Sequence, residues 1–93
     1  MIRDFKDAEA AKIFRRERSL SLPIEIQRIA WRKLNMLDFA NRLDDLRVPP
    51  GNRLGKLAGD RQGSYSIRIN DRWRICFESR DEGAWSVEIV DYH

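Results

Sequence analysis

The chain has 93 residues, the usual size of one folded domain, and we expect a single domain over residues 1–93. Apolar residues make up 42% and charged residues 35%, and no apolar run approaches the ~18 residues that a membrane-spanning helix needs. The single cysteine, Cys76, excludes an internal disulfide framework, and Cys76 with His93 cannot supply the ligands of a structural zinc site. The N-terminus is charged from its third residue and lacks the apolar segment of a secretory signal, so we expect a cytoplasmic protein.

The first half of the chain has the apolar spacing of two helices. The first is predicted over residues 7–16, with Asp7 as its N-cap. The second begins near Pro23, because proline suits the first turn of a helix. Residues 47–52, with two prolines and a glycine, predict a loop that separates the helices from the strands. The second helix has apolar residues at intervals of three and four: Ile26, Ile29, Ala30, Leu34, Leu37 and Ala40.

The second half alternates apolar and polar residues, as antiparallel strands do. We expect strands over 64–69, 73–78 and 84–91, joined by a polar loop at 70–72 and a five-residue loop at 79–83. With this pairing, all opposed apolar residues lie on one face of the sheet, and we expect the helices to cover that face. The predicted fold class is therefore α+β, with two N-terminal helices packed on one face of a small antiparallel sheet. The pairs are Ile69 and Trp73, Ile67 and Ile75, Tyr65 and Phe77 in the first hairpin, and Trp73 and Ile89, Ile75 and Val87, Phe77 and Trp85 in the second.

Positive charge is concentrated between Arg53 and Arg74, where six cationic and two anionic side chains give +4, against +3 for the whole chain. Such a segment indicates contact with phosphate or with an acidic protein, although a solvated face is the commoner outcome. The predicted register also places Arg68 opposite Arg74, and facing like charges destabilise a sheet by up to ~1 kcal/mol. Either Glu88, on the other side of Arg74, completes a structural ion-pair row, or the arginines hold a phosphate with Arg61 or Arg53 nearby.

The chain ends with Asp91, Tyr92 and His93. His93 is the sole histidine, and imidazole is the side chain whose unperturbed pKa, about 6.5, suits proton transfer in both directions near neutrality. A terminal histidine is nevertheless more often solvent-exposed than catalytic. Cleavage of RNA by its own 2′-hydroxyl needs a base, an acid and cations, and His93, Asp91 or Tyr92, and the arginines can supply them. Strand alternation puts Asp91 and Tyr92 on opposite faces, so the three converge only if the tail twists.

Several sequence motifs together resemble one family. They are Ile2 to Phe5, Asn52 to Leu54, Gly59-Asp60-Arg61, the run from Gly63 to Phe77 with its Trp-Arg-Ile strand, and the terminal Asp91-Tyr92-His93. This combination resembles the HigB toxins of the RelE/ParE superfamily, over essentially the whole chain. The resemblance implies a RelE-like fold in which residues 2–5 add a short strand to the sheet. It also implies an endoribonuclease that uses no metal or cofactor. Its catalytic residues would be His93, Tyr92, Asp91 and Arg74, with RNA phosphates held by Arg68, Arg61, Arg53 and Lys56.

The resemblance further implies the toxin of a type II toxin-antitoxin pair, which cuts messenger RNA on the ribosome and is silenced by a helix-turn-helix antitoxin, HigA. Operator DNA would be contacted only through the toxin-antitoxin complex, and no membrane is involved. Some relatives carry a histidine and a lysine just before the Gly-Asp-Arg motif, where this chain has Gly55 and Ala58 with Lys56 between them. That difference would be consistent with a weaker or slower cleavage step.

Two alternatives of other classes stay open. A ParE-like toxin would use the same fold to poison DNA gyrase without cutting RNA, although the terminal Asp-Tyr-His sequence argues against it. A basic RNA-binding module would bind RNA with strong salt dependence, would not be toxic, and would tolerate the removal of His93.

Overall fold

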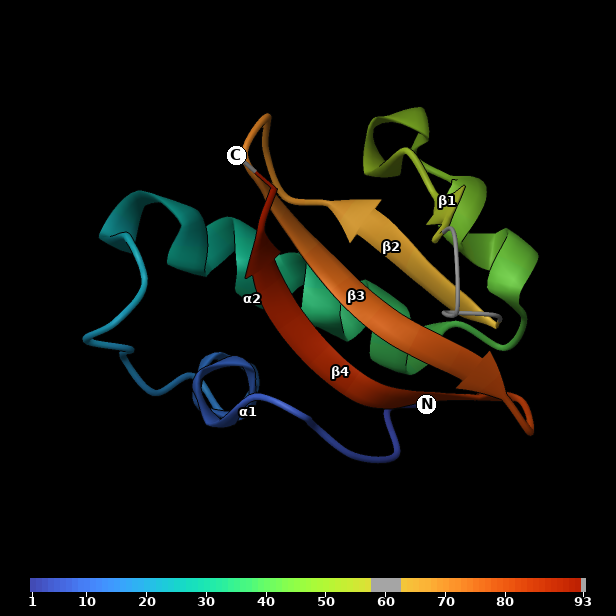
Figure 1. Ribbon diagram of the computed structural model, residues 1–93, viewed down its shortest axis with the longest axis horizontal. Coiled ribbons are helices and arrows are strands. Elements are labelled where there is room, and N and C mark those ends of the chain that lie inside the picture. The colour runs from blue at the N-terminus through green and yellow to red at the C-terminus, as the bar shows by residue number, and fades with distance from the viewer. Residues whose placement is uncertain (58–62, 93) are drawn as a thin grey trace.

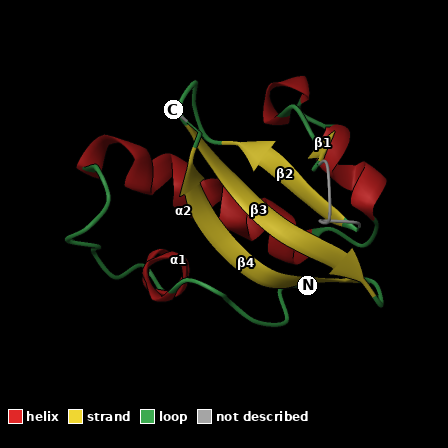
Figure 2. Ribbon diagram, viewed as in Figure 1, coloured by secondary structure: helices red, strands yellow, loops and turns green. Residues whose placement is uncertain are grey.

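The computed structural model describes residues 1–57 and 63–92, and it confirms the predicted α+β fold, with helices packed against an antiparallel sheet (Figures 1 and 2). Five residues named in the sequence analysis lie outside the described residues: Ala58, Gly59, Asp60, Arg61 and His93. The four strands lie in the order β1-β2-β3-β4. The elements are α1 (Ala8–Phe14), α2 (Ile24–Phe39), the 3-10 turns η1 (Leu43–Arg47) and η2 (Pro50–Asn52), β1 (Gly55–Lys56), β2 (Ser64–Arg68), β3 (Trp73–Arg80) and β4 (Gly83–Asp91).

Both helices form where the apolar spacing predicts them. The Asp7 carboxylate accepts a hydrogen bond from the Glu9 amide (2.9 Å) and so caps α1. Pro23 immediately precedes α2, which crosses behind the sheet (Figure 1). Within the described residues, no helix is long and apolar enough to cross a membrane. The stripe of α2 predicted to face the core is buried at Ile26, Ala30, Leu34 and Leu37, and partly buried at Ile29 and Ala40.

The loop predicted at residues 47–52 is wrong in part, because η2 occupies its second half and η1 ends at Arg47. Proline has a fixed φ that suits the first position of a helical turn, so Pro50 starts η2 where a plain loop is expected. This short turn orders the chain directly before β1.

The hairpin of β2 and β3 has the predicted register. Tyr65 lies opposite Phe77, Ile67 opposite Ile75, and the Ile69 amide donates to the Trp73 carbonyl (2.9 Å). The alternation of apolar residues in both strands and the short polar turn agree, and together they determine which residues face each other.

The predicted register of β3 with β4 is wrong. Ile75 lies opposite Ile89, not Val87, and Trp73 lies opposite Asp91, not Ile89. Two features shift the pairing. The connecting turn has two residues, Asp81 and Glu82, with φ of 50° and 57°, where five were expected. In addition, β4 carries one extra residue opposite Phe77, a β-bulge that includes Ser86 with φ of 52°.

The bulge reverses which face of β4 is buried. Trp85, expected opposite Phe77 in the core, instead lies opposite Glu78, and its indole nitrogen donates to the Arg80 carbonyl (3.1 Å). Ala84 takes the buried position, with 3% exposure. The extra residue of the bulge shifts the alternation of buried and outward side chains by one, so even-numbered residues face the core before the bulge and odd-numbered residues after it.

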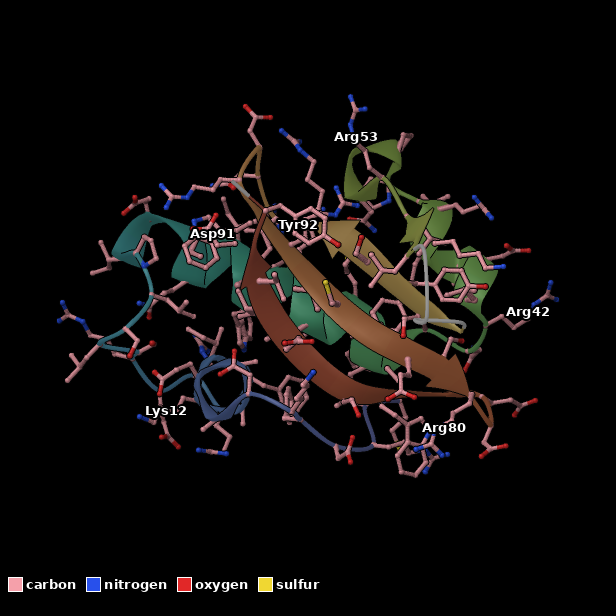
Figure 3. The ribbon with its side chains drawn as sticks, in the orientation of Figure 1. Lys12, Arg42, Arg53, Arg80, Asp91 and Tyr92 are labelled. Carbon is pink, nitrogen blue, oxygen red and sulfur yellow. The ribbon has the colours of Figure 1, made fainter. Side chains whose placement is uncertain are left out.

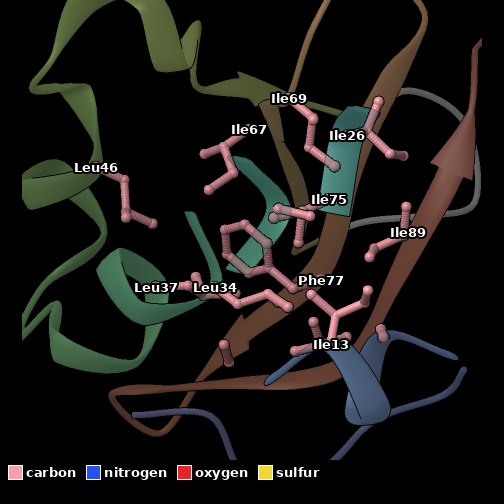
Figure 4. Close-up of a cluster of buried hydrophobic side chains, with 14 residues drawn as sticks. Ile13, Ile26, Leu34, Leu37, Leu46, Ile67, Ile69, Ile75, Phe77 and Ile89 are labelled. Carbon is pink, nitrogen blue, oxygen red and sulfur yellow. The ribbon is translucent and has the colours of Figure 1, made fainter. Parts of the chain in front are cut away.

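The core lies between the sheet and the helices (Figure 4). Side chains of this type stabilise the fold by about 1.5–3 kcal/mol each when fully buried. Cys76 is also buried, as predicted. The helices contribute Ile13, Ile26, Leu34 and Leu37, and the strands contribute Ile67, Ile75, Phe77, Val87 and Ile89.

The N-terminal segment joins the edge of β4, although not as the expected strand. Only isolated parallel bridges form, from Ile2 to Ala84 and from Phe5 to Val87. Between them the Asp4 carboxylate accepts a hydrogen bond from the Ser86 amide at the bulge (2.5 Å). A bulge interrupts the regular ladder of backbone hydrogen bonds, which explains why no continuous strand forms here.

Candidate functional site

Tyr92 lies on the face of the sheet turned away from α2 (Figure 3), and the Arg74 guanidinium lies beside its ring. Arg74, in β3, donates from Nε to the Ser66 hydroxyl (2.8 Å) and from Nη2 to the Arg53 carbonyl (2.7 Å). Its guanidinium carbon lies 5.8 Å from the centroid of the Tyr92 ring. These contacts fix the orientation of the guanidinium before any ligand binds, and among the described residues no hydrogen bond to its Nη1 is found.

The carbonyl that holds Arg74 depends on a buried hydrogen-bond network. Asn52 is fully buried, accepts a hydrogen bond from the Lys33 ammonium, and donates to the Leu46 carbonyl (3.1 Å). Arg53 follows in a left-handed conformation (φ 44°, ψ 53°), which turns the chain at the end of η2. Burial lowers the pKa of Lys33, and the charges of Arg32 and Arg68 lower it further.

Arg53 itself, predicted to contact RNA phosphate, extends its side chain away from the sheet (Figure 3). The contact that the structure brings to Arg74 is the Arg53 backbone carbonyl. Lys56, another predicted RNA contact, lies exposed on β1 opposite Tyr65.

Arg68 lies opposite Arg74, as predicted, and its guanidinium forms an ion pair with Asp71 in the hairpin turn. The predicted ion-pair row through Glu88 is wrong. Glu88 lies opposite Cys76 and pairs with Lys6 (3.6 Å), because the shorter turn and the bulge shift β4 along β3. The residue opposite Arg74 on β4 is Val90. The alternative, in which the arginines hold a phosphate, stays a prediction.

Asp91 is bound by Arg72, a residue that the sequence analysis did not include in the site. Arg72 donates from Nε to both carboxylate oxygens (2.9 and 3.0 Å) and from Nη2 to Oδ2 (2.8 Å). The Asp91 carboxylate raises the pKa of Arg72 above its ordinary value. The Tyr92 amide also donates to the Arg72 carbonyl (2.6 Å). Arg72 therefore fixes the end of β4 next to the hairpin turn.

Tyr92 lies on the Arg74 side of the sheet, as strand alternation predicts, and is 47% exposed. Its hydroxyl is 4.0 Å from the Cys76 sulfur. The structure thus brings together Arg74 and Tyr92, with Arg68 on the neighbouring strand and Asp91 joined to the β2–β3 turn through Arg72. A guanidinium beside a phenol on an open surface can bind a phosphodiester and place a proton donor next to it.

The two helices packed on an antiparallel sheet are consistent with the fold of a RelE-like protein. The family model described as RelE-like toxin of type II toxin-antitoxin system HigB matches residues 3–93. The chain is 38% identical to Toxin HigB-1 of Vibrio cholerae serotype O1 over 79 residues, which cover 84% of this chain and 83% of that protein. It is 31% identical over 94 residues to Endoribonuclease HigB of Proteus vulgaris, covering 100% of both chains. The chain therefore belongs to the HigB-like toxin family.

This membership confirms the resemblance and makes the protein a RelE-like toxin of a type II toxin-antitoxin system. A toxin of this type has an antitoxin as its partner. An uncharacterized protein of Haemophilus influenzae is also similar, with 33% identity over 57 residues, 61% of this chain and 56% of that protein.

Proposed function

We propose that this toxin is an endoribonuclease that cleaves messenger RNA on the ribosome and so inhibits translation and growth, with His93, Tyr92, Asp91 and Arg74 as its catalytic residues. The observation that carries the proposal is the placement of Arg74, held between Ser66 and the Arg53 carbonyl with its guanidinium beside the Tyr92 ring. The family of the chain supports the same activity, since a full-length relative is named an endoribonuclease.

The proposed reaction is attack of a ribose 2′-hydroxyl on the adjacent phosphate. One group removes the proton of the 2′-hydroxyl, another protonates the departing 5′-oxygen, and a cation stabilises the charge that develops on the phosphate. Arg74 serves the last role, because its guanidinium is held beside the Tyr92 ring and carries N–H donors beyond the two that bind Ser66 and the Arg53 carbonyl. His93 serves one proton transfer, and Tyr92 or Asp91 serves the other. The scheme requires no metal and no cofactor.

The strand to be cut is proposed to lie along the cationic side of the sheet. Arg68 is on β2 opposite Arg74 and shares its face of the sheet. Lys56, opposite Tyr65 on the edge strand β1, lies on the other face, so the RNA would reach it by passing over this edge. Together with Arg61 and Arg53, these residues would contact successive phosphates. The proposed partner is a HigA-type helix-turn-helix antitoxin, and operator DNA is bound only through the complex. Activity on ribosomes places the toxin in the cytoplasm.

The test is cleavage of a defined messenger RNA by the purified protein, with and without programmed ribosomes, comparing the wild type with His93→Ala. Cuts that need both the ribosome and His93 support the proposal. A protein that inhibits growth and DNA gyrase but makes no cuts would identify a ParE-like toxin instead. A protein that binds RNA without cutting it or inhibiting growth would be a basic RNA-binding module.

A further inference from the structure

A second arginine-rich surface lies between α1 and α2, at the opposite end of the molecule from β1 (Figure 1). It is a cleft of about 240 Å³, and it shares no residue with the site around Arg74. Its lining includes two apolar side chains, a glutamine and three arginines: Ile13, Trp31, Gln27, Arg16, Arg18 and Arg28.

Arg16 has an unusual backbone conformation for an arginine. It lies just beyond the end of α1 with φ of 64°, in the left-handed region. Its amide donates to the Ile13 carbonyl (2.9 Å), and the Glu17 amide donates to the Lys12 carbonyl (2.8 Å). Glycine usually occupies this position, because a Cβ in the left-handed conformation comes close to the backbone. The two hydrogen bonds cap the end of α1 in the usual way, and the residue they hold in this conformation, Arg16, lines the cleft.

The Arg16 side chain covers an aromatic wall of the cleft. Its guanidinium carbon lies 4.6 Å from the centroid of the Trp31 ring. The loop that carries it is held by Gln27, whose amide nitrogen donates to the Ser19 carbonyl (2.8 Å) and the Leu22 carbonyl (2.9 Å). The cleft is therefore formed in advance, which reduces the ordering cost when a ligand binds.

The cleft arginines have no ion-pair partner within the part of the chain that the structure describes. Glu17, the acidic residue of the lining, pairs with Arg15 (2.7 Å). Among residues 1–57 and 63–92, no carboxylate lies within ion-pair distance of Arg16, Arg18 or Arg28. Unpaired guanidinium groups at one cleft attract an anion with several charges.

We propose that this cleft is a second RNA-binding site, which takes the backbone of a single-stranded segment with its phosphates on Arg16, Arg18 and Arg28. RNA fits better than an acidic peptide for a physical reason. A guanidinium stacked on an indole offers planar surface to a base as well as donors to a phosphate, whereas an acidic peptide uses only the charge. RNA held at both ends of the molecule would lie in one fixed direction across the protein.

The test is fluorescence anisotropy with a labelled single-stranded RNA of about 12 nucleotides, in a His93→Ala background so that the probe is not cut. The variant Arg16→Gln/Arg28→Gln should weaken binding at least about tenfold and reduce the salt slope by about 1.4, as expected for two lost phosphate contacts. Arg80→Gln is a matched control, because the Arg80 guanidinium lies 4.0 Å from the Trp85 ring but has carboxylates of Glu78 and Asp81 within 4.0 Å. It should change the affinity less than twofold.

A second variant separates binding from folding. Arg16→Gly removes the guanidinium and also the left-handed strain, so it should weaken RNA binding without lowering Tm. Unchanged RNA affinity in both Arg16→Gln/Arg28→Gln and Arg16→Gly would overturn the proposal. Binding of polyglutamate that these substitutions abolish, with RNA binding left intact, would overturn it as well. The measurement uses binding alone, so a failure of the wild type to cleave RNA would count against the proposed catalytic function and not against this site.

Discussion

Arg72 and Asp91 are 19 residues apart in sequence, and the Arg72 guanidinium contacts both oxygens of the Asp91 carboxylate. The pair joins the turn between β2 and β3 to the end of β4. The pair therefore fixes the position of the backbone at Tyr92, the residue before His93.

Loss of this pair should affect activity more than stability. We expect Arg72→Gln to lower messenger RNA cleavage by about tenfold, because a shift of about 1 Å at a reacting group has large effects on rate. The free energy of unfolding should change little, since the pair is exposed to solvent, which screens its charges. Cleavage assays and urea unfolding measure the two effects. Arg47→Gln, which breaks another exposed pair with Asp44, is the control and should change neither appreciably.

Cleavage should depend on both the positive charge and the planar, forked shape of the Arg74 guanidinium. Arg74→Ala is expected to reduce the cleavage rate about 100- to 1,000-fold, as removal of a preorganised donor does in other enzymes. Arg74→Lys keeps the charge but not the fork, so it should be intermediate. Ser66→Ala removes one of the contacts that orient the guanidinium and should cost about tenfold. A fully active Arg74→Ala protein would contradict the proposed role.

The buried Lys33 should make stability depend on pH. Burial lowers its pKa from the ordinary 10.5, so between the folded pKa and 10.5 the unfolded chain binds more protons than the folded chain. The free energy of unfolding therefore rises with pH through this interval. In Lys33→Met this contribution should vanish. Urea unfolding of both proteins at several pH values below 10.5 gives the difference, with Lys12→Met as the surface control. A difference between wild type and Lys33→Met that does not change with pH would refute the assignment.

The turn between β3 and β4 should be improved by glycine. Glu82 has φ of 57°, where a side chain is strained and glycine is not. Glu82→Gly is therefore expected to stabilise the protein by about 0.5–1 kcal/mol, the left-handed penalty of a side chain less the extra conformational entropy of glycine in the unfolded chain. Thermal unfolding would detect this as a rise in Tm of about 2–8 °C. Glu82→Ala removes the same side chain but keeps a Cβ, so it should give no such gain. Equal Tm values for the two variants would show that strain is not the cause.

The sequence was sufficient for the helices and for the first hairpin because two signals agree there. The spacing of Ile26, Leu34 and Leu37 defines one face of α2, and the alternation in β2 and β3 fits the short turn between them. The second hairpin lacked this agreement. Gly83 suggested a longer loop, and nothing in the sequence around Ser86 indicates a bulge, which depends on backbone contacts with the distant Asp4.

The errors at the candidate site follow from that register. With β4 shifted, Glu88 appeared to neutralise Arg74, and Arg72 was not seen to lie beside Asp91. The face on which Tyr92 lies was still predicted correctly. A shift of two residues leaves every side chain on its original face, so Tyr92 stays on the Arg74 side. The buried network of Lys33 and Asn52 could not be predicted, because it joins two elements that no local pattern relates.

Because of the bulge at Ser86, the part of β4 that follows the bulge does not tolerate a change in length, whereas the turn before it does. A residue deleted between Ser86 and Asp91 would exchange the two faces of this segment, which would bring Tyr92 to the helix side and Asp91 to the Arg74 side. A residue added to the turn at Asp81 and Glu82 changes only an exposed connection. Insertions and deletions in natural variants of this chain should therefore collect in the turn and be absent between Ser86 and the C-terminus.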